Sequence, residues 1–117
     1  MIKACTHAFA GLDYAYNKEQ NLRIEIMAAC LALGGGILLR ISSFEWCMII
    51  ICIAVVLSME IVNTAIERLC NRLHAGYDKE IGVIKDLAAA AVLLVALMSA
   101  ICGAIIFVPK IIYIFKS

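Results

Sequence analysis

The residues that could do chemistry form a polar stripe within an apolar stretch. Glu60 is followed by Asn63, Thr64, Glu67 and Asn71, at distances of three, four, seven and eleven residues. At about 100° per residue these positions share an arc of roughly 100° on one helix face, with the two glutamates about 10.5 Å apart along the axis. Because an ionisable residue inside a membrane segment is costly, it is a functional hypothesis by default. We interpret the stripe as a site rather than as one protonated acid bonded to a neighbouring helix.

Other charged residues are expected at the same end of the molecule. Glu19 and Glu25 flank the start of one apolar segment, and Lys85-Asp86 opens another. Carboxylates together with substrate phosphates hold Mg²⁺, and a lysine offers a point charge to phosphates. Asp86 could orient Lys85 or bond a nucleotide hydroxyl. These residue types predict a site for a nucleotide with its metal.

The stripe supplies the groups that would act on the acceptor of a phosphoryl group. Glu60, in low-dielectric surroundings, could accept a proton as a general base, and Asn63 could orient an attacking hydroxyl. The chain has neither G-x-x-x-x-G-K-[ST] nor G-x-G-x-x-G. Any ATP site is therefore built differently from a Walker loop or a kinase glycine loop.

Composition places these residues in a membrane. The chain has 117 residues, of which 65% are hydrophobic, and its mean hydropathy is +1.01, whereas soluble domains average about 45–50% apolar residues. The net charge of +1 and the lack of a basic tract give no reason to expect nucleic acid. The six cysteines form no C-x-x-C pair, and we interpret them as small apolar side chains. His7 and His74 have no second ligand at helical spacing, so we interpret both as interfacial residues.

Three segments are long and apolar enough to span a bilayer, at about residues 22–40, 44–71 and 83–108. Residues 87–108 carry no charge and would measure roughly 33 Å as a helix, against a hydrocarbon core of about 30 Å. Pro109 and Lys110 are expected to end this span. Glycines 34–36 and alanines 88–91 indicate close helix packing. We predict an all-α membrane protein with one domain over residues 1–117, in which a short turn joins the first two spans as a hairpin.

The segment before the first span has a different pattern. Phe9, Leu12 and Tyr16 recur at helical spacing across about residues 3–19, with Lys3, Asp13 and Lys18 as the charged complement. This pattern favours an amphipathic helix on the membrane surface over a frayed soluble tail.

The distribution of basic residues predicts the orientation. Seven lie on the side of the N-terminus and second loop, against three on the other side. This asymmetry predicts a cytoplasmic N-terminus and a cytoplasmic loop from about residue 73 to residue 85, within reach of nucleotide. The seven are Lys3, Lys18, Arg23, Arg68, Arg72, Lys79 and Lys85; the three are Arg40, Lys110 and Lys116.

The motifs resemble those of the prokaryotic diacylglycerol kinase family, which also includes undecaprenol kinases. The similarity is carried by EIVNTAIE at residues 60–67 and KDLAAAAVL at residues 85–93. It extends upstream through AFAGL at residues 8–12 and EQNLRIE at residues 19–25, and so covers nearly the whole chain.

The resemblance implies a homotrimer of three-span subunits with surface helices, in the bacterial cytoplasmic (inner) membrane. Such an enzyme transfers the γ-phosphate of Mg-ATP to a lipid hydroxyl. Packing between subunits would also shield the polar stripe from lipid. Matched by position, the resemblance implies Glu60 as catalytic base, Asn63, Gly11 and Glu25 in the lipid site, Glu19 and Glu67 as carriers of Mg²⁺ and ATP, and Lys85 and Asp86 as nucleotide contacts.

Two features leave questions open. Asn71 stands where the family usually has Asp, which puts a second metal contact, or tight nucleotide binding, in question without removing the core set of site residues. Glu25 after Asn-Leu-Arg-Ile resembles the diacylglycerol-type members, whereas the segments at residues 8–11 and 106–110 resemble the undecaprenol type. We expect diacylglycerol as substrate, with undecaprenol as the alternative.

A protein of another class could use the same stripe. Glu60 and Glu67 could form a proton path in a small membrane conductor, or the chain could be a purely structural hairpin. A proton path does not require Glu19, Lys85 and Asp86, whereas a nucleotide site does. The interfacial charges therefore favour the kinase.

Overall fold

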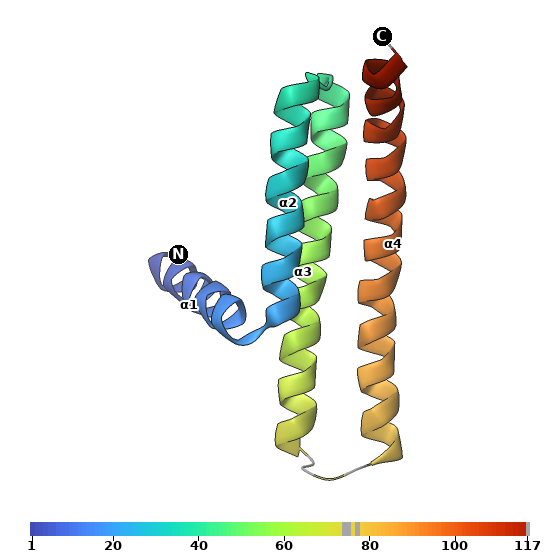
Figure 1. Ribbon diagram of the computed structural model, residues 1–117. Helices are drawn as coiled ribbons and strands as arrows, with labels where there is room; N and C mark the ends of the chain where they lie inside the picture. The colour runs from blue at the N-terminus through green and yellow to red at the C-terminus, as the bar shows by residue number, and fades with distance from the viewer. Residues whose placement is uncertain (74–75, 77, 117) are drawn as a thin grey trace.

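The computed structural model describes residues 1–73, 76 and 78–116, so the expectation for His74 lies outside the described residues. Within these ranges the chain forms α1 (Ile2–Lys18), α2 (Gln20–Leu39), α3 (Ser43–Leu73) and α4 (Lys79–Lys116). The last three are long and apolar enough to cross a membrane, which confirms the predicted all-α class. Figure 1 shows α2 and α3 as a hairpin, α4 alongside α3, and α1 projecting sideways from the start of α2.

Local hydrogen bonds define the turn between α2 and α3. Arg40 has a φ of 53°, in the left-handed region, and its backbone N–H donates to the carbonyl oxygens of Gly36 and Ile37. Ser42 and Glu45 then form a reciprocal capping box: the Glu45 N–H donates to Ser42 Oγ (3.2 Å), and the Ser42 N–H donates to Glu45 Oε1 (2.9 Å). These bonds satisfy backbone groups at both helix ends and fix the sharp reversal of the chain.

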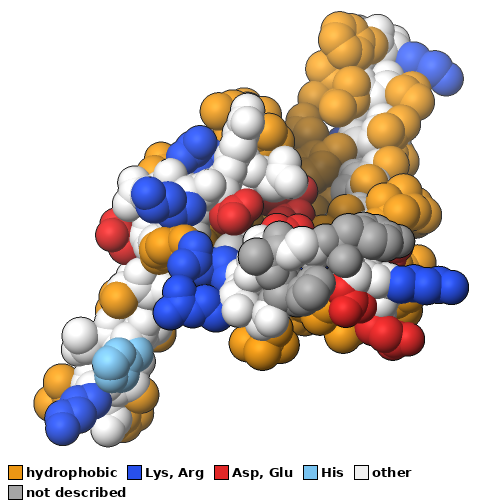
Figure 2. All heavy atoms as spheres, turned by 90° about the horizontal axis from the view of Figure 1, so that it is seen from below, with side chains coloured by type: hydrophobic (Ala, Val, Ile, Leu, Met, Phe, Trp, Pro, Cys, Tyr) orange, Lys and Arg blue, Asp and Glu red, His pale blue; other side chains and the backbone are white. Residues whose placement is uncertain are grey.

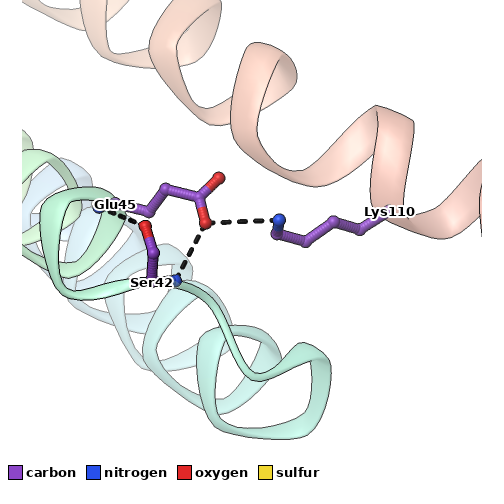
Figure 3. Close-up of polar contacts among 3 residues, drawn as sticks. All are labelled: Ser42, Glu45 and Lys110. Atoms are coloured by element: carbon purple, nitrogen blue, oxygen red, sulfur yellow. Dashed lines mark hydrogen bonds and ion pairs between the residues drawn. The ribbon is translucent and has the colours of Figure 1, made fainter.

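An ion pair connects this turn to the third span. Lys110 Nζ lies 3.2 Å from Glu45 Oε1, the same oxygen that accepts the Ser42 N–H (Figure 3). Both side chains are partly exposed, so the pair contributes little to stability. It marks the contact between α4 and the end of the hairpin.

Both ends of α4 differ from the prediction. The helix begins at Lys79 instead of 83, because Asp78 Oδ1 accepts the N–H groups of Glu80 (2.8 Å) and Ile81 (3.4 Å) as an N-cap. Much of the loop expected before residue 85 is therefore helical. The helix also continues past Pro109 to Lys116, whereas the sequence predicted that Pro109 and Lys110 close the span. Proline removes one backbone donor, and membrane helices tolerate this loss.

A cluster of buried apolar side chains lies at the end of the bundle that contains this turn. The buried side chains of Ile41, Ile49 and Ile106 form a cluster there, with Trp46 and Phe107 packed against it. A Cβ atom built on Gly36 would lie 2.9 Å from Trp46 Cη2 and 3.0 Å from Ile41 Cδ1. The close packing predicted for the glycine run is thus found at Gly36, whereas the position of Gly34 faces open space.

Much of the apolar surface remains uncovered within the single chain. In α4 the one buried residue among those described is Ile106, and large side chains such as Leu94 and Ile105 are about two-thirds exposed. A soluble monomer rarely exposes so large an apolar surface. Lipid or other protein must therefore cover α4.

Candidate active site

The polar stripe lies on the half of α3 that extends toward the α3–α4 loop. Its side chains differ in whether they form hydrogen bonds within the helix. Thr64 is 8% exposed, and its Oγ1 donates to the Glu60 carbonyl oxygen (3.0 Å). Its hydroxyl is therefore used within the helix. Asn63 Nδ2 donates to Glu67 Oε1 (3.4 Å), one turn along the same face. The groups left for chemistry are the carboxylates of Glu60 and Glu67 and the oxygen of Asn63.

Asn63 carries a buried oxygen without a donor. Its Oδ1 accepts no hydrogen bond from any part of the chain that the structure describes. A buried acceptor left unpaired costs about 1–3 kcal/mol, so such a group calls for an explanation. A hydroxyl from a bound molecule would supply the missing donor.

Three carboxylates from three segments act on Glu60. Glu19, Glu25 and Glu67 all contribute a like-charge interaction to the half-buried Glu60. Figure 2 shows the molecule from below. Acidic side chains gather near the centre of the visible surface, and basic side chains border them on the side of α1. Across the described residues, no three His, Cys, Asp or Glu side chains form a complete metal cluster. A cation held here would need further ligands from a bound molecule, and it would relieve the repulsion.

The bend between α1 and α2 places Glu19. This residue is extended (φ −113°, ψ 111°), and its N–H donates to the Ala15 carbonyl oxygen. The Arg23 guanidinium donates to the carbonyl oxygens of Tyr16 (3.0 Å) and Asn17 (3.2 Å). A cation on the last carbonyls of a helix satisfies them and complements the helix dipole. Arg23 therefore stabilises the end of α1 at the bend; sequence reasoning gave it no such role.

A second contact ties α1 to α3 beside Glu67. The Arg68 guanidinium carbon lies 4.7 Å from the centroid of the Tyr14 ring, and Arg68 also donates to the Tyr14 hydroxyl. This cation–π geometry joins the surface helix to the helix that carries the stripe. Sequence reasoning missed the pair, since nothing local connects positions so far apart in the chain.

Lys85 of α4 bonds to α3 rather than to its neighbour Asp86. Lys85 Nζ donates to Asn71 Oδ1 at 2.6 Å. Lys85 is half-buried, while Asp86 and Asn71 are exposed. Lys85 is therefore oriented by Asn71, whereas one of the two expectations for Asp86 was that it would orient Lys85. Asn71 is the residue that departs from the family pattern.

The two remaining predicted residues lie in different surroundings. Gly11 is on the exposed surface of α1, and a Cβ there would meet nothing within 4 Å. Glu25 lines a cavity of about 560 Å³ between α2, α3 and α4, where it is the one charged side chain among the described lining residues. From Glu25 to Leu39 the cavity follows α2 for roughly 21 Å. Ser99, whose buried Oγ has no partner in the described chain, also lines it.

The family follows from the sequence as a whole. The pattern that defines the prokaryotic diacylglycerol kinases matches residues 6–107. This chain belongs to that family. Membership makes the protein a lipid kinase, which uses ATP, and it decides against the proton conductor and the structural hairpin.

The relatives of the chain include both an undecaprenol kinase and diacylglycerol kinases by name. It is 35% identical over 108 residues to the undecaprenol kinase of Bacillus subtilis (strain 168), covering 92% of this chain and 88% of that protein. It is 30% identical over 106 residues to the diacylglycerol kinase of Escherichia coli (strain K12), covering 91% and 87%. A diacylglycerol kinase from Synechocystis is 28% identical over 104 residues, covering 88% of this chain and 59% of that protein.

Proposed function

We propose that this lipid kinase phosphorylates diacylglycerol to phosphatidic acid at the end of the bundle where α1 meets α2. The observation that carries the proposal is the unpaired, buried Oδ1 of Asn63 on the same helix face as Glu60. A lipid alcohol can donate its single hydroxyl hydrogen to such an oxygen as it binds. When the alcohol turns to attack, this hydrogen moves from Asn63 Oδ1 to the neighbouring Glu60 carboxylate, which takes the proton.

Glu60 is the proposed general base. It is half-buried, and the negative charges of Glu19, Glu25 and Glu67 repel its carboxylate. Asn63 orients the attacking hydroxyl, and Glu60 accepts the proton as the oxygen attacks the γ-phosphorus in line with the leaving group. Holding both reactants in this geometry supplies much of the catalysis in phosphoryl transfer.

Mg²⁺ fits the carboxylates of this end of the bundle. Glu19 at the bend and Glu67 on α3 are the proposed metal ligands, with nucleotide phosphates completing the set. Mg²⁺ is commonly held by one or two carboxylates plus substrate phosphates, so the lack of a complete cluster among the described residues is compatible with it. When bound, the ion neutralises charge on the phosphates.

The nucleotide is held by residues from both sides of the site. Glu19, Glu67, Lys85 and Asp86 are the proposed ATP contacts. Lys85 attracts the phosphates as a point charge, and Asp86, exposed at the start of the third span, bonds a nucleotide hydroxyl.

Diacylglycerol is favoured by Glu25, which follows Asn-Leu-Arg-Ile as in the diacylglycerol-type members of the family. This carboxylate lies in the wall of the apolar cavity, which can receive the apolar chains of the lipid. Gly11 is proposed to line the same lipid site from α1, on the strength of the family resemblance. Undecaprenol is the second candidate, since the identity to the Bacillus subtilis undecaprenol kinase is 35%.

We also propose a homotrimer in the bacterial cytoplasmic membrane, with the N-terminus and the site facing the cytoplasm. The uncovered apolar surface of α4 supports association with further copies. The orientation follows from the excess of basic residues on the side of α1 and the α3–α4 loop.

A radiolabelled ATP assay tests the substrate. Diacylglycerol and undecaprenol are offered together, at equal mole fraction, in mixed micelles with Mg²⁺. Label chiefly in phosphatidic acid is the expected result. Label chiefly in undecaprenyl phosphate would reject diacylglycerol as the main substrate and leave the kinase intact, whereas label in neither lipid would contradict the proposal as a whole.

A further inference from the structure

The ammonium group of Lys85 is held by a neutral side chain. Its Nζ donates to Asn71 Oδ1 at 2.6 Å, a hydrogen bond from a charged donor to a neutral acceptor. No carboxylate in the described chain forms an ion pair with Lys85; the ion pair found there joins Lys110 to Glu45, near the opposite ends of α4 and α3.

A neutral acceptor has a different effect from a carboxylate. Lysine has three donor hydrogens on a flexible four-carbon stem. The bond to Asn71 uses one donor and restricts the stem, and two donors remain for another ligand. Because the amide carries no net charge, the full positive charge of Lys85 stays available. An Asp at position 71 would hold the ammonium equally well and would cancel much of its charge.

The neighbouring charged groups leave this arrangement intact. Glu67 lies one turn before Asn71 on α3 and accepts from Asn63, while Arg68 bonds Tyr14. Asp86, next to Lys85, is exposed. None of them takes the place of Asn71 as the partner of Lys85.

We propose that Asn71 is a positioning residue for nucleotide: it holds the Lys85 ammonium across the gap between α3 and α4, with its charge uncompensated, for the phosphates of ATP. The inference rests on the proposed role of Lys85 and deepens it. It assigns a function to the one position at which the stripe departs from the family pattern.

Steady-state kinetics of three variants test the proposal. Asn71→Ala removes the acceptor and should raise the KM for Mg-ATP about tenfold, equivalent to about 1.4 kcal/mol. The kcat and the KM for lipid should stay within about twofold. Asn71→Asp keeps an acceptor but compensates the charge, so it should raise the same KM. Arg72→Gln changes the net charge as Asn71→Asp does, at an exposed neighbouring residue without a bond to Lys85, and should leave all constants unchanged.

A binding measurement supplies a readout that does not depend on turnover. Titration calorimetry with a non-hydrolysable Mg-ATP analogue should show weaker binding for Asn71→Ala than for wild type. Adding Asn71→Ala to Lys85→Met should weaken binding no further, because the two residues act through one bond.

The outcomes separate this inference from the proposed function. If Lys85→Met raises the KM for Mg-ATP and Asn71→Ala leaves it within twofold of wild type, the positioning role is overturned and the function stands. A wild-type KM in Asn71→Asp would overturn the need for an uncompensated charge. Equal losses for lipid and nucleotide, with a lower unfolding midpoint, would make Asn71 merely structural. If Lys85→Met has no effect on nucleotide, the assigned role of Lys85 fails and the inference with it.

Discussion

Replacing Gly36 with alanine tests how tightly α2 packs against the turn that follows it. The new Cβ would lie 2.9 Å from Trp46 Cη2, 3.0 Å from Ile41 Cδ1 and 3.1 Å from Trp46 Cζ2. Overpacking of this kind costs about 1–3 kcal/mol. Replacing a helical glycine with alanine also returns about 0.5–1 kcal/mol of backbone entropy and helix propensity.

Gly34 provides the matched control on the same helix. A Cβ at this position meets nothing within 4 Å, so Gly34→Ala should gain the propensity term of about 0.5–1 kcal/mol without the steric cost. The free energies of unfolding of the two variants should therefore differ by the overpacking cost, about 1–3 kcal/mol, with Gly36→Ala the less stable.

Reversible unfolding in dodecyl maltoside micelles, titrated with sodium dodecyl sulfate, measures this difference. Trp46 is the sole tryptophan of the chain and packs against the cluster concerned, so its fluorescence reports the relevant end of the bundle. Equal midpoints for the two variants, or a more stable Gly36→Ala, would refute the packing argument. Lipid phosphorylation per folded molecule should be unchanged in both variants, because these glycines lie at the opposite end of the spans from Glu60.

Three further outcomes follow from other contacts. Ser42→Ala removes half of the capping box and should lower the free energy of unfolding by about 1 kcal/mol, while Ser43→Ala should change it by less than about 0.5 kcal/mol in the same titration. Tyr14→Leu removes the stack with Arg68 and should speed amide hydrogen exchange in α1, whereas Tyr16→Leu should not; equal exchange rates would argue against the tether. Chelation of divalent cations with EDTA should abolish lipid phosphorylation and added Mg²⁺ should restore it, and activity that persists in EDTA would contradict a metal-dependent site.

The features that could be predicted from sequence are those with local causes. Length and hydropathy gave three spans, and the spacing of polar residues put Glu60, Asn63 and Glu67 on one helix face. The electrostatic coupling of Glu60 to Glu19 and Glu25 agrees with the expected gathering of carboxylates at one end. Their catalytic and metal-binding roles stay predictions.

The features that sequence reasoning missed depend on tertiary placement. The Arg68–Tyr14 pair and the Lys85–Asn71 bond each join two helices, and no local pattern marks either partner. The end of α4 differs for another reason: a proline is typical of a helix end, but a membrane helix can lose one backbone donor and continue, as α4 does past Pro109. The unpaired oxygen of Asn63 emerged only when its surroundings were known.

The turnover of Glu60→Gln tests the assignment of the active site most directly. The substitution keeps the size of the side chain and removes the proton acceptor, so kcat should fall by at least about 100-fold, as expected for loss of a general base. Glu45→Gln is the matched control, because it removes a carboxylate from the same helix at the end away from the site; its turnover per folded molecule should match wild type. A folded Glu60→Gln protein with the oligomeric state of wild type and near-wild-type turnover would contradict Glu60 as the base.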